Sequence, residues 1–278
     1  MIRDIAGRQN HSVKLARKLQ KKKHRRERGL LVCEGMDLLR AAIEAGAQVR
    51  EVLVRRDLMS GLPADLLERA SQTGALDRTF DIGVCDEETL EYASSLGGGV
   101  DVVFICVEPA WNLADVALAE GVTFLLDGVG DPGNVGTVVR SALAFGLAGV
   151  LCSPGTADPY SPKALRAGMG AQFTLPVVTE VSPADLRARL AAAGERGEAV
   201  PQVWVADPHQ GDDIRSARPG AGTVVVLGGE RRGPGSGWAG ARRVTIPQKR
   251  FESINVAMAG TIFAYESGRG LQPEPNGK

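Results

Sequence analysis

The second half of the chain alternates short apolar runs with stretches of helical spacing, a pattern typical of a parallel sheet covered by helices. Strands are expected in VTFLLD, GVLCS, FTLPVV, VWVAD, TVVVLGG and RRVTIP. Helices are expected to begin at Asn134 and Asn255, and to cover residues 161–169 and the segment DLRARLAAAGE. The sequence therefore predicts an α/β domain with a parallel sheet over residues 122–268.

The first 108 residues predict a second, smaller α/β domain. An apolar strand in LLVCEG is followed by a helix with Leu38, Leu39, Ala42 and Ile43 at helical spacing. Further helices are expected near residues 62–72 and 87–96, and further strands at 52–54, at 79–84 and in VVFICVE. A length of 278 residues agrees with two domains. Residues 109–121 would connect them, and residues 269–278 would form a disordered tail.

The composition is that of a globular protein of the cytoplasm. Apolar residues make up 44% and charged residues 24% of the chain, which is ordinary for packed domains. No apolar run approaches the roughly 20 residues that span a bilayer, and the start, MIRDIAGRQN, lacks the apolar core of a signal peptide. We expect a cytoplasmic protein without a membrane partner.

The four cysteines, Cys33, Cys85, Cys106 and Cys152, are scattered, and three of them lie inside apolar stretches. They form no CxxC pair, and the three histidines are not spaced to share a metal with them. Free cysteine behaves as a small apolar residue in a reducing compartment. We therefore expect buried, reduced, structural thiols and no bound metal.

Charge is unevenly distributed, although the net charge is zero. The segment KLARKLQKKKHRRER, residues 14–28, holds nine Lys or Arg against the single Glu27. A solvated helix face is one interpretation, but a basic cluster in an otherwise neutral protein favours binding to phosphates of a nucleic acid. The candidate RNA contacts in this segment are Lys14, Lys18, Lys21, Lys22, Arg25 and Arg26.

Gly128, Gly130 and Gly133 spell GxGxxG between an expected strand and a helix, which suggests a dinucleotide site. A dinucleotide site also needs an acidic residue about 20 positions later, at the end of the next strand. That strand ends in Leu-Cys-Ser here, and Pro132 lies within the turn. A nicotinamide or flavin enzyme is therefore disfavoured.

Polar residues follow the strands at one edge of the expected sheet, where open α/β proteins bind ligands. Glu230 follows one strand, and Ser253 and Asn255 follow another. On the helix from Asn134, the residues Val135, Val139, Ala142 and Leu143 share an apolar face, so Arg140 points elsewhere. Gly136 lies one turn before it, leaving room for a ligand to meet the guanidinium. The alternative is a surface Arg on an ordinary helix.

These segments resemble, in order and spacing, the three motifs of the SpoU/TrmH family of RNA ribose 2′-O-methyltransferases, part of the SPOUT superfamily. The motifs are NVGTVVRSALAFG, LGGERRG and IPQKRFESINVAMA. Upstream, SVKLARKLQKKKHRRERGLLVCEG is similar to the N-terminal domain, related to ribosomal protein L30e, with which many members hold ribosomal RNA. The resemblance covers essentially the whole chain.

The resemblance implies a deep trefoil knot in the C-terminal domain, S-adenosylmethionine bound in the knotted loops, and a homodimer with sites at its interface. It implies that Gly228, Ile246 and Ile254 hold the cofactor, largely through backbone groups. Asn134 and Arg166 are further cofactor candidates, the latter from the looser match ALRAGMGAQF.

By the same resemblance, Arg140 is the central catalytic residue. A guanidinium with a pKa above about 12 is a poor base near neutrality, so we interpret Arg140 as a clamp on the adjacent phosphate and a stabiliser of the developing oxyanion. Glu230 would fix Arg140 or Asn134. Ser253 and Asn255 would order the cofactor loop.

Two departures from the motifs stand out. Gly229 occupies the position where the family usually has Asn. The third motif usually continues Ile-Pro-Met and is one residue longer before Ser, whereas Gln248, Lys249 and Arg250 make a shorter, more basic loop here. Two other functions stay open: a non-catalytic RNA-binding protein on the same fold, and a transfer-RNA ribose methyltransferase. Because such transfer-RNA enzymes often lack the L30e-like domain, the basic N-terminal half favours ribosomal RNA. Target nucleotide and base identity are not readable from the sequence.

Overall fold

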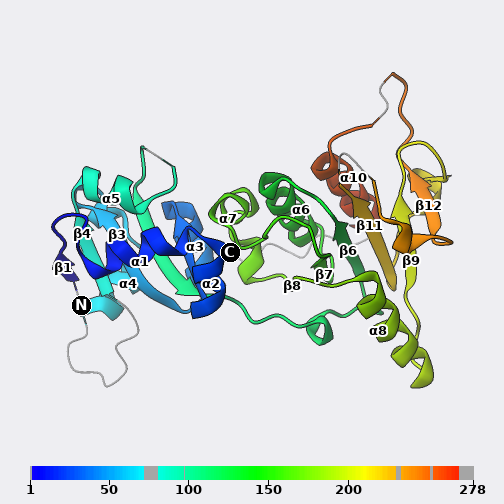
Figure 1. The fold of residues 1–278 in the computed structure, drawn as a ribbon, viewed down its shortest axis with the longest axis horizontal. Helices are drawn as coiled ribbons and strands as arrows, with labels where there is room; N and C mark the ends of the chain where they lie inside the picture. Colours follow the sequence, from blue (N-terminus) through cyan, green and yellow to red (C-terminus); the bar gives the residue numbers. More distant parts are fainter. Residues whose placement is uncertain (1, 72–80, 97, 230–232, 251–252, 269–278) are drawn as a thin grey trace. The chain divides into compact units, whose positions relative to one another are not determined.

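The computed structural model of the chain describes residues 2–71, 81–96, 98–229, 233–250 and 253–268 (Figure 1). The chain forms two compact units, the first from Met1–Ala110 with Tyr160–Thr174, and the second from Trp111–Pro159 with Leu175–Lys278. The chain leaves the first unit inside the expected connection, residues 109–121. The sequence did not indicate that residues 160–174 belong to the first unit.

The first unit contains a five-stranded mixed sheet in the order β1-β4-β3-β5-β2. Strands β1, β4 and β3 are parallel, whereas β5 runs antiparallel to both β3 and β2. The strands are β1 (Ile2–Asp4), β2 (Leu30–Glu34), β3 (Val49–Arg55), β4 (Asp81–Cys85) and β5 (Val102–Val107). The helices are α1 (His11–Leu19), α2 (Lys22–Arg28), α3 (Met36–Glu44), α4 (Ala64–Ser71), α5 (Glu87–Ala93) and α7 (Pro162–Gly168), with 3-10 turns at Arg56–Gly61 and Ala171–Phe173.

The second unit contains a seven-stranded sheet in the order β10-β12-β9-β11-β6-β7-β8, and every strand pair in it is parallel. The predicted parallel α/β architecture is confirmed. The strands are β6 (Val122–Asp127), β7 (Gly149–Cys152), β8 (Val177–Val178), β9 (Gln202–Ala206), β10 (Asp212–Asp213), β11 (Thr223–Gly228) and β12 (Arg242–Thr245). The helices are α6 (Pro132–Ala144), α8 (Pro183–Glu195), α9 (Ile214–Ala217) and α10 (Val256–Gly268), with 3-10 turns at Leu113–Asp115 and Ser236–Trp238. None of the described helices is long and apolar enough to cross a membrane.

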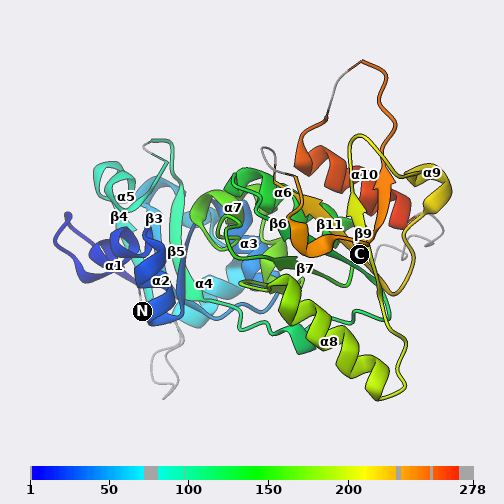
Figure 2. The ribbon, with the colours of Figure 1, turned by 45° about the vertical axis from the view of Figure 1, so that its right-hand side comes forward.

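Helices cover both faces of the second sheet. On one face α8 buries Leu186 and Leu190 against Val224 and Val226 of β11. Alternate residues of a strand face opposite sides, and Leu227 meets α10, where a Cβ added at Gly260 would lie 3.1 Å from it and 3.1 Å from Val138 of α6. Figure 2 shows α6 and α10 side by side, with α8 on the other side of the sheet. Because Gly260 carries no side chain, the two helices that bear the first and third motifs can pack closely.

Capping residues set where these two helices begin. The Asp131 side chain accepts hydrogen bonds from the amides of Gly133 and Asn134, and Pro132 occupies the first helical position, where it loses no hydrogen bond. The expectation that α6 begins at Asn134 is therefore wrong by two residues. Before α10, the Asn255 side chain accepts from Ala257 and Met258, so that helix begins where the sequence predicts it.

A carboxylate at the end of β6 ties two loops of the second unit together. Asp127 accepts hydrogen bonds from the Gly235 amide and the Trp238 indole, both at 2.8 Å, and from the Ser153 hydroxyl at 2.8 Å. Its backbone carbonyl accepts from the Gly229 amide at 2.9 Å. These contacts hold the loop after β11 over the neighbouring strand end.

The basic segment of the first unit forms two helices, and not all of its charges face outward. Arg25 is only 3% exposed, and its guanidinium donates to the carbonyls of Leu19 at 2.9 Å and Gln20 at 3.0 Å. These are carbonyls at the end of α1, which lack partners within their own helix. The proposal that Arg25 contacts RNA is corrected: it is a buried cap of α1.

We expect Arg25→Ala to lower the free energy of unfolding by about 2–3 kcal/mol, because it removes a charged donor and leaves two buried carbonyls unpaired. The exposed neighbour Arg26 is the matched control, and Arg26→Ala should change stability by less than about 0.5 kcal/mol. Urea unfolding compares the two variants. Equal midpoints would contradict the capping role.

Candidate functional site

A cavity of about 680 Å³ opens at the carboxyl edge of the second sheet. Its walls come from the ends of β9, β11 and β12, from the loop before α10 and from α10 itself. Its polar lining residues are Asp207, His209, Arg243, Gln248, Ser253 and Asn255, and its apolar ones include Leu227, Ile246, Ile254, Val256 and Phe263. The three residues expected to hold a cofactor, Gly228, Ile246 and Ile254, all line it, as do Ser253 and Asn255.

Asn134 and Asn255 are 121 residues apart in sequence and are joined by a hydrogen bond. The Asn255 amide nitrogen donates to the side-chain oxygen of Asn134 at 3.1 Å. The side-chain oxygen of Asn255 accepts the hydrogen bonds that cap α10. Both the nitrogen and the oxygen of its amide are therefore engaged. The structure thereby brings the first and third motifs together at the mouth of the cavity.

Two successive glycines shape the wall at the end of β11. A Cβ at Gly228 would lie 2.2 Å from the nitrogen of Pro234, and one at Gly229 would lie 2.2 Å from the carbonyl oxygen of Gly128. Neither position has room for a side chain along this backbone path, which explains Gly229 where the family usually has Asn. The amide of Gly233 closes the loop onto the Gly229 carbonyl at 2.9 Å. Glu230, proposed as a catalytic residue, lies outside the described residues.

Asp207, directly after β9, and Arg243, on the neighbouring strand β12, form an ion pair in the cavity wall. The side chain of Asp207 is 10% exposed, and its carboxylate also accepts from the amides of His209 at 2.8 Å and Gln210 at 3.1 Å. Burial has the largest single effect on its pKa and raises it, but these hydrogen bonds and that from Arg243 together bring the pKa below its ordinary value. The wall therefore carries a fixed carboxylate.

Arg140 lies exposed on α6, whereas Gly136, one turn earlier, is buried. The expectation that a ligand would approach both along one open face is therefore wrong for Gly136. Arg140 is not among the residues that line the cavity; it lies on α6, the helix that also carries Asn134.

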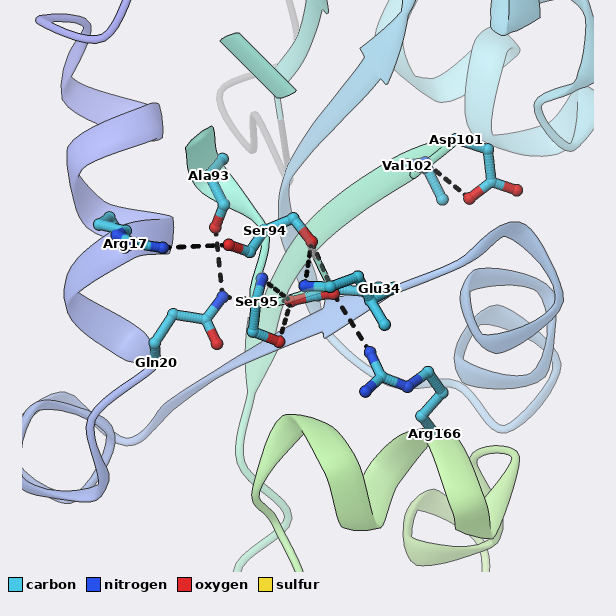
Figure 3. A network of polar contacts seen from close by, with 10 residues as sticks. Arg17, Gln20, Glu34, Ala93, Ser94, Ser95, Asp101, Val102 and Arg166 are labelled. Carbon is cyan, nitrogen blue, oxygen red and sulfur yellow. Dashed lines mark hydrogen bonds and ion pairs between the residues drawn. The ribbon is translucent and has the colours of Figure 1, made fainter. Parts of the chain in front are cut away.

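Arg166 belongs to the first unit, where it lies beside Glu34 (Figure 3), and its role in cofactor binding stays a prediction. Its guanidinium pairs with Glu34 at 3.3 Å, and the Glu34 side chain is only 1% exposed. The same carboxylate accepts from the hydroxyls of Ser94 at 2.9 Å and Ser95 at 2.8 Å, from the Ser95 amide at 2.8 Å and from Gln20 at 3.2 Å. A buried carboxylate needs such partners, and Arg166 supplies the positive one.

Sequence reasoning missed Asp207, Arg243 and Gln248. Asp207 ends the run VWVAD, and Arg243 and Gln248 lie in and after RRVTIP. Polar residues at the carboxyl ends of parallel strands are a recognisable signal of a binding edge. Applying that rule to every expected strand, and not only to the three motifs, would have found the first of them.

The lining fits S-adenosylmethionine. Apolar side chains such as Ile246, Ile254 and Phe263 can cover an adenine ring, and a wall without side chains at Gly228 exposes backbone groups for hydrogen bonds. A parallel α/β unit with such a cavity at its carboxyl edge defines a ligand-binding enzyme of the open-sheet class.

The chain belongs to the SpoU rRNA Methylase family, whose model matches residues 121–265. An MRM3-like substrate binding domain matches residues 10–96. The chain is 28% identical over 267 residues to the 23S rRNA (guanosine(2553)-2'-O)-methyltransferase RlmP of Bacillus subtilis, covering 95% of this chain and 98% of the relative. It is 30% identical over 278 residues to an uncharacterized tRNA/rRNA methyltransferase of Synechocystis, covering 96% and 94%.

Among solved structures, the AdoMet-bound rRNA methyltransferase from Sinorhizobium meliloti has a TM-score of 0.80 at 26% identity, covering 98% of this chain and 99% of that chain. The fold and the family thus agree along the whole chain. The protein is an S-adenosylmethionine-dependent RNA methyltransferase.

We expect Asp207→Asn to lower the melting temperature at neutral pH, since it removes the charge that faces Arg243. A carboxylate with a depressed pKa stabilises the fold fully above its unfolded value, about 3.9, and loses this effect as the pH falls through the lower folded value. The difference between wild type and variant should therefore shrink below about pH 4. Calorimetry at several pH values measures it.

The matched control is Asp212→Asn, because the Asp212 side chain pairs with Arg242 but is 57% exposed. This variant should change the melting temperature little at any pH. If wild type still melted above Asp207→Asn by the same margin at about pH 3, the stabilising role of the ionised Asp207 carboxylate would be contradicted.

Proposed function

We propose that the protein methylates a ribose 2′-hydroxyl of 23S ribosomal RNA. One observation carries the proposal: the hydrogen bond between Asn134 and Asn255 joins two motifs at a cavity lined by Gly228, Ile246 and Ile254. The relatives named as 23S rRNA 2′-O-methyltransferases support the substrate and the reaction. In this proposal the bound cofactor supplies an electrophilic methyl group, and the protein positions the hydroxyl that receives it.

Arg140 is proposed to clamp the phosphate beside the target ribose and to stabilise the negative charge that develops on its oxygen. Its exposed place on α6 suits contact with a polyanion, and a guanidinium matches phosphate geometry. Asn134 and Asn255 hold α6 and α10 in register, so Arg140 keeps a fixed place relative to the cavity wall. Ser253 and Glu230 remain proposed contributors in the two loops.

The first unit is proposed to bind the RNA. Helix α1 buries Val13, Ala16 and Leu19 and leaves Lys14 and Lys18 exposed. Exposed residues continue along the segment with Lys21, Lys22 and Arg26. A row of cations that borders one side of a domain attracts phosphates without reading sequence. The match to an MRM3-like substrate binding domain supports this division of labour.

We propose that the protein acts as a homodimer through α6 and α10. Met258 is 64% and Tyr265 54% exposed, and residues seven apart lie on one face of a helix. Leu143 of α6 is 36% exposed, and Phe145 stacks edge-on against Tyr265 with ring centroids 5.8 Å apart. A second copy of the chain would cover these apolar groups beside Arg140. A deep trefoil knot in the C-terminal domain and a cytoplasmic location complete the proposal.

We expect Met258→Glu to convert a dimer to a monomer, because it places a charge in the apolar contact. Val200, which is 53% exposed and lies between α8 and β9, is the matched control. Val200→Glu should leave the mass unchanged. Light scattering after size-exclusion chromatography measures both, and a dimer that survived Met258→Glu would refute this interface.

The function is tested with methyl-labelled S-adenosylmethionine and separate pools of unmodified large-subunit rRNA, small-subunit rRNA and total tRNA. We expect label in a 2′-O-methyl group of one large-subunit nucleotide. Label only in tRNA would replace the proposed substrate with the transfer-RNA alternative. Binding of RNA without label or cofactor binding would favour the non-catalytic alternative.

The same assay tests Arg140. We expect Arg140→Ala to reduce methyl transfer at least about 100-fold, the size of losing one stabiliser of an oxyanion, while cofactor affinity stays at the wild-type value. Arg40→Ala, at an exposed position of α3 in the first unit, removes the same charge and should retain activity. Comparable turnover in the two variants would remove Arg140 from the mechanism.

A further inference from the structure

One polar atom in the wall of the cavity has no hydrogen-bond partner. The side-chain oxygen Oε1 of Gln248 is buried, and no described residue donates to it. More than about nine in ten buried polar groups in proteins are hydrogen-bonded, and leaving an acceptor unpaired is unfavourable. Gln248 also lines the cavity, so a ligand bound there would lie beside this side chain.

Two side-chain donors of the surrounding wall are engaged elsewhere: Arg243 pairs with Asp207, and the amide nitrogen of Asn255 donates to Asn134. The buried oxygen of Gln248 accepts from neither of them, and a ligand would bring a donor to it.

The chemistry of the amide indicates which part of the ligand it meets. A glutamine presents an acceptor beside a donor, and this pair matches the 6-amino group and N7 of adenine. A buried ammonium would need a carboxylate, and Asp207 is already paired with Arg243. Ribose hydroxyls can turn to water at the opening, whereas the amino group of a buried ring cannot. Ile246, two residues before Gln248, offers apolar cover for such a ring.

We propose that Gln248 recognises the adenine edge of S-adenosylmethionine, with Oε1 accepting from the 6-amino group. The inference rests on the proposed function, because it assigns a role within the same cavity. Gln248 stands where the family usually continues with Met, so this contact is a specificity-determining feature of this chain's own loop.

The test is calorimetric binding of two ligands, S-adenosylhomocysteine and its hypoxanthine counterpart S-inosylhomocysteine, in which oxygen replaces the 6-amino group. Wild type should prefer the adenine ligand by about 5- to 150-fold, the range for a bidentate contact to a base. Gln248→Met, of similar size, should weaken binding of the adenine ligand about tenfold or more and reduce the preference to within about threefold.

A second readout separates this role from a structural one. Removing an unpaired buried acceptor should leave the melting temperature of the free protein unchanged or raise it, while the increase caused by S-adenosylhomocysteine becomes smaller. Gln48→Met, the same substitution at an exposed residue of the first unit, should alter neither measurement. A Gln248→Met variant that melts lower without ligand would assign Gln248 to folding and overturn the proposal.

Binding by wild type tests the proposed function, whereas the comparison with Gln248→Met tests the adenine contact. A wild type that binds neither ligand would refute the proposed function along with the role of Gln248. A wild type that binds S-adenosylhomocysteine, with Gln248→Met showing the same affinity and the same preference, would refute the adenine contact alone.

Discussion

The carboxylate of Asp127 is the contact on which the binding edge of the second unit depends. It stands at the end of the central strand β6 and receives hydrogen bonds from the loop after β7 and from two points of the loop after β11. These bonds draw the second loop back over its own strand, so close that Gly228 and Gly229 have no space for a Cβ. The shape of the cavity wall thus depends on hydrogen bonds from several neutral donors to one carboxylate. Such bonds offset the free-energy cost of burying its charge.

The periodicity of the sequence predicted most of the strands and helices because the spacing of apolar residues within each segment determines its secondary structure. Strands such as β6 and β11 are apolar on both faces, as a parallel sheet covered by helices requires. Elements whose pairing depends on distant residues escaped detection: β1 is a three-residue strand paired with β4, and β10 has two residues paired with β12. The start of α6 was placed two residues late because the cap came from Asp131, and the glycine between them hid the helical pattern.

The site residues also divide into those that a local motif identifies and those that depend on distant contacts. Residues inside the three motifs, including Gly228, Ile246 and Asn255, gather at one cavity as expected. Residue type alone misled at Arg25, because its guanidinium serves a buried partner inside the first unit. The pairing of Arg166 with Glu34 could not be inferred from spacing either, since 132 residues separate them. Asp207 belongs to no motif, and Gln248 departs from the third motif's usual residue; only the folded sheet brings them into the same wall.

The return of residues 160–174 to the first unit means that the chain crosses between the units three times, after Ala110, Pro159 and Thr174. The five strands of the first sheet have all been synthesised by Val107, yet Arg166, the cation that pairs with Glu34, is made only later. On the ribosome, the first unit therefore cannot reach its final state while only its own contiguous stretch has emerged. It must wait for roughly the first third of the second unit, which makes the order of translation and the order of completion differ.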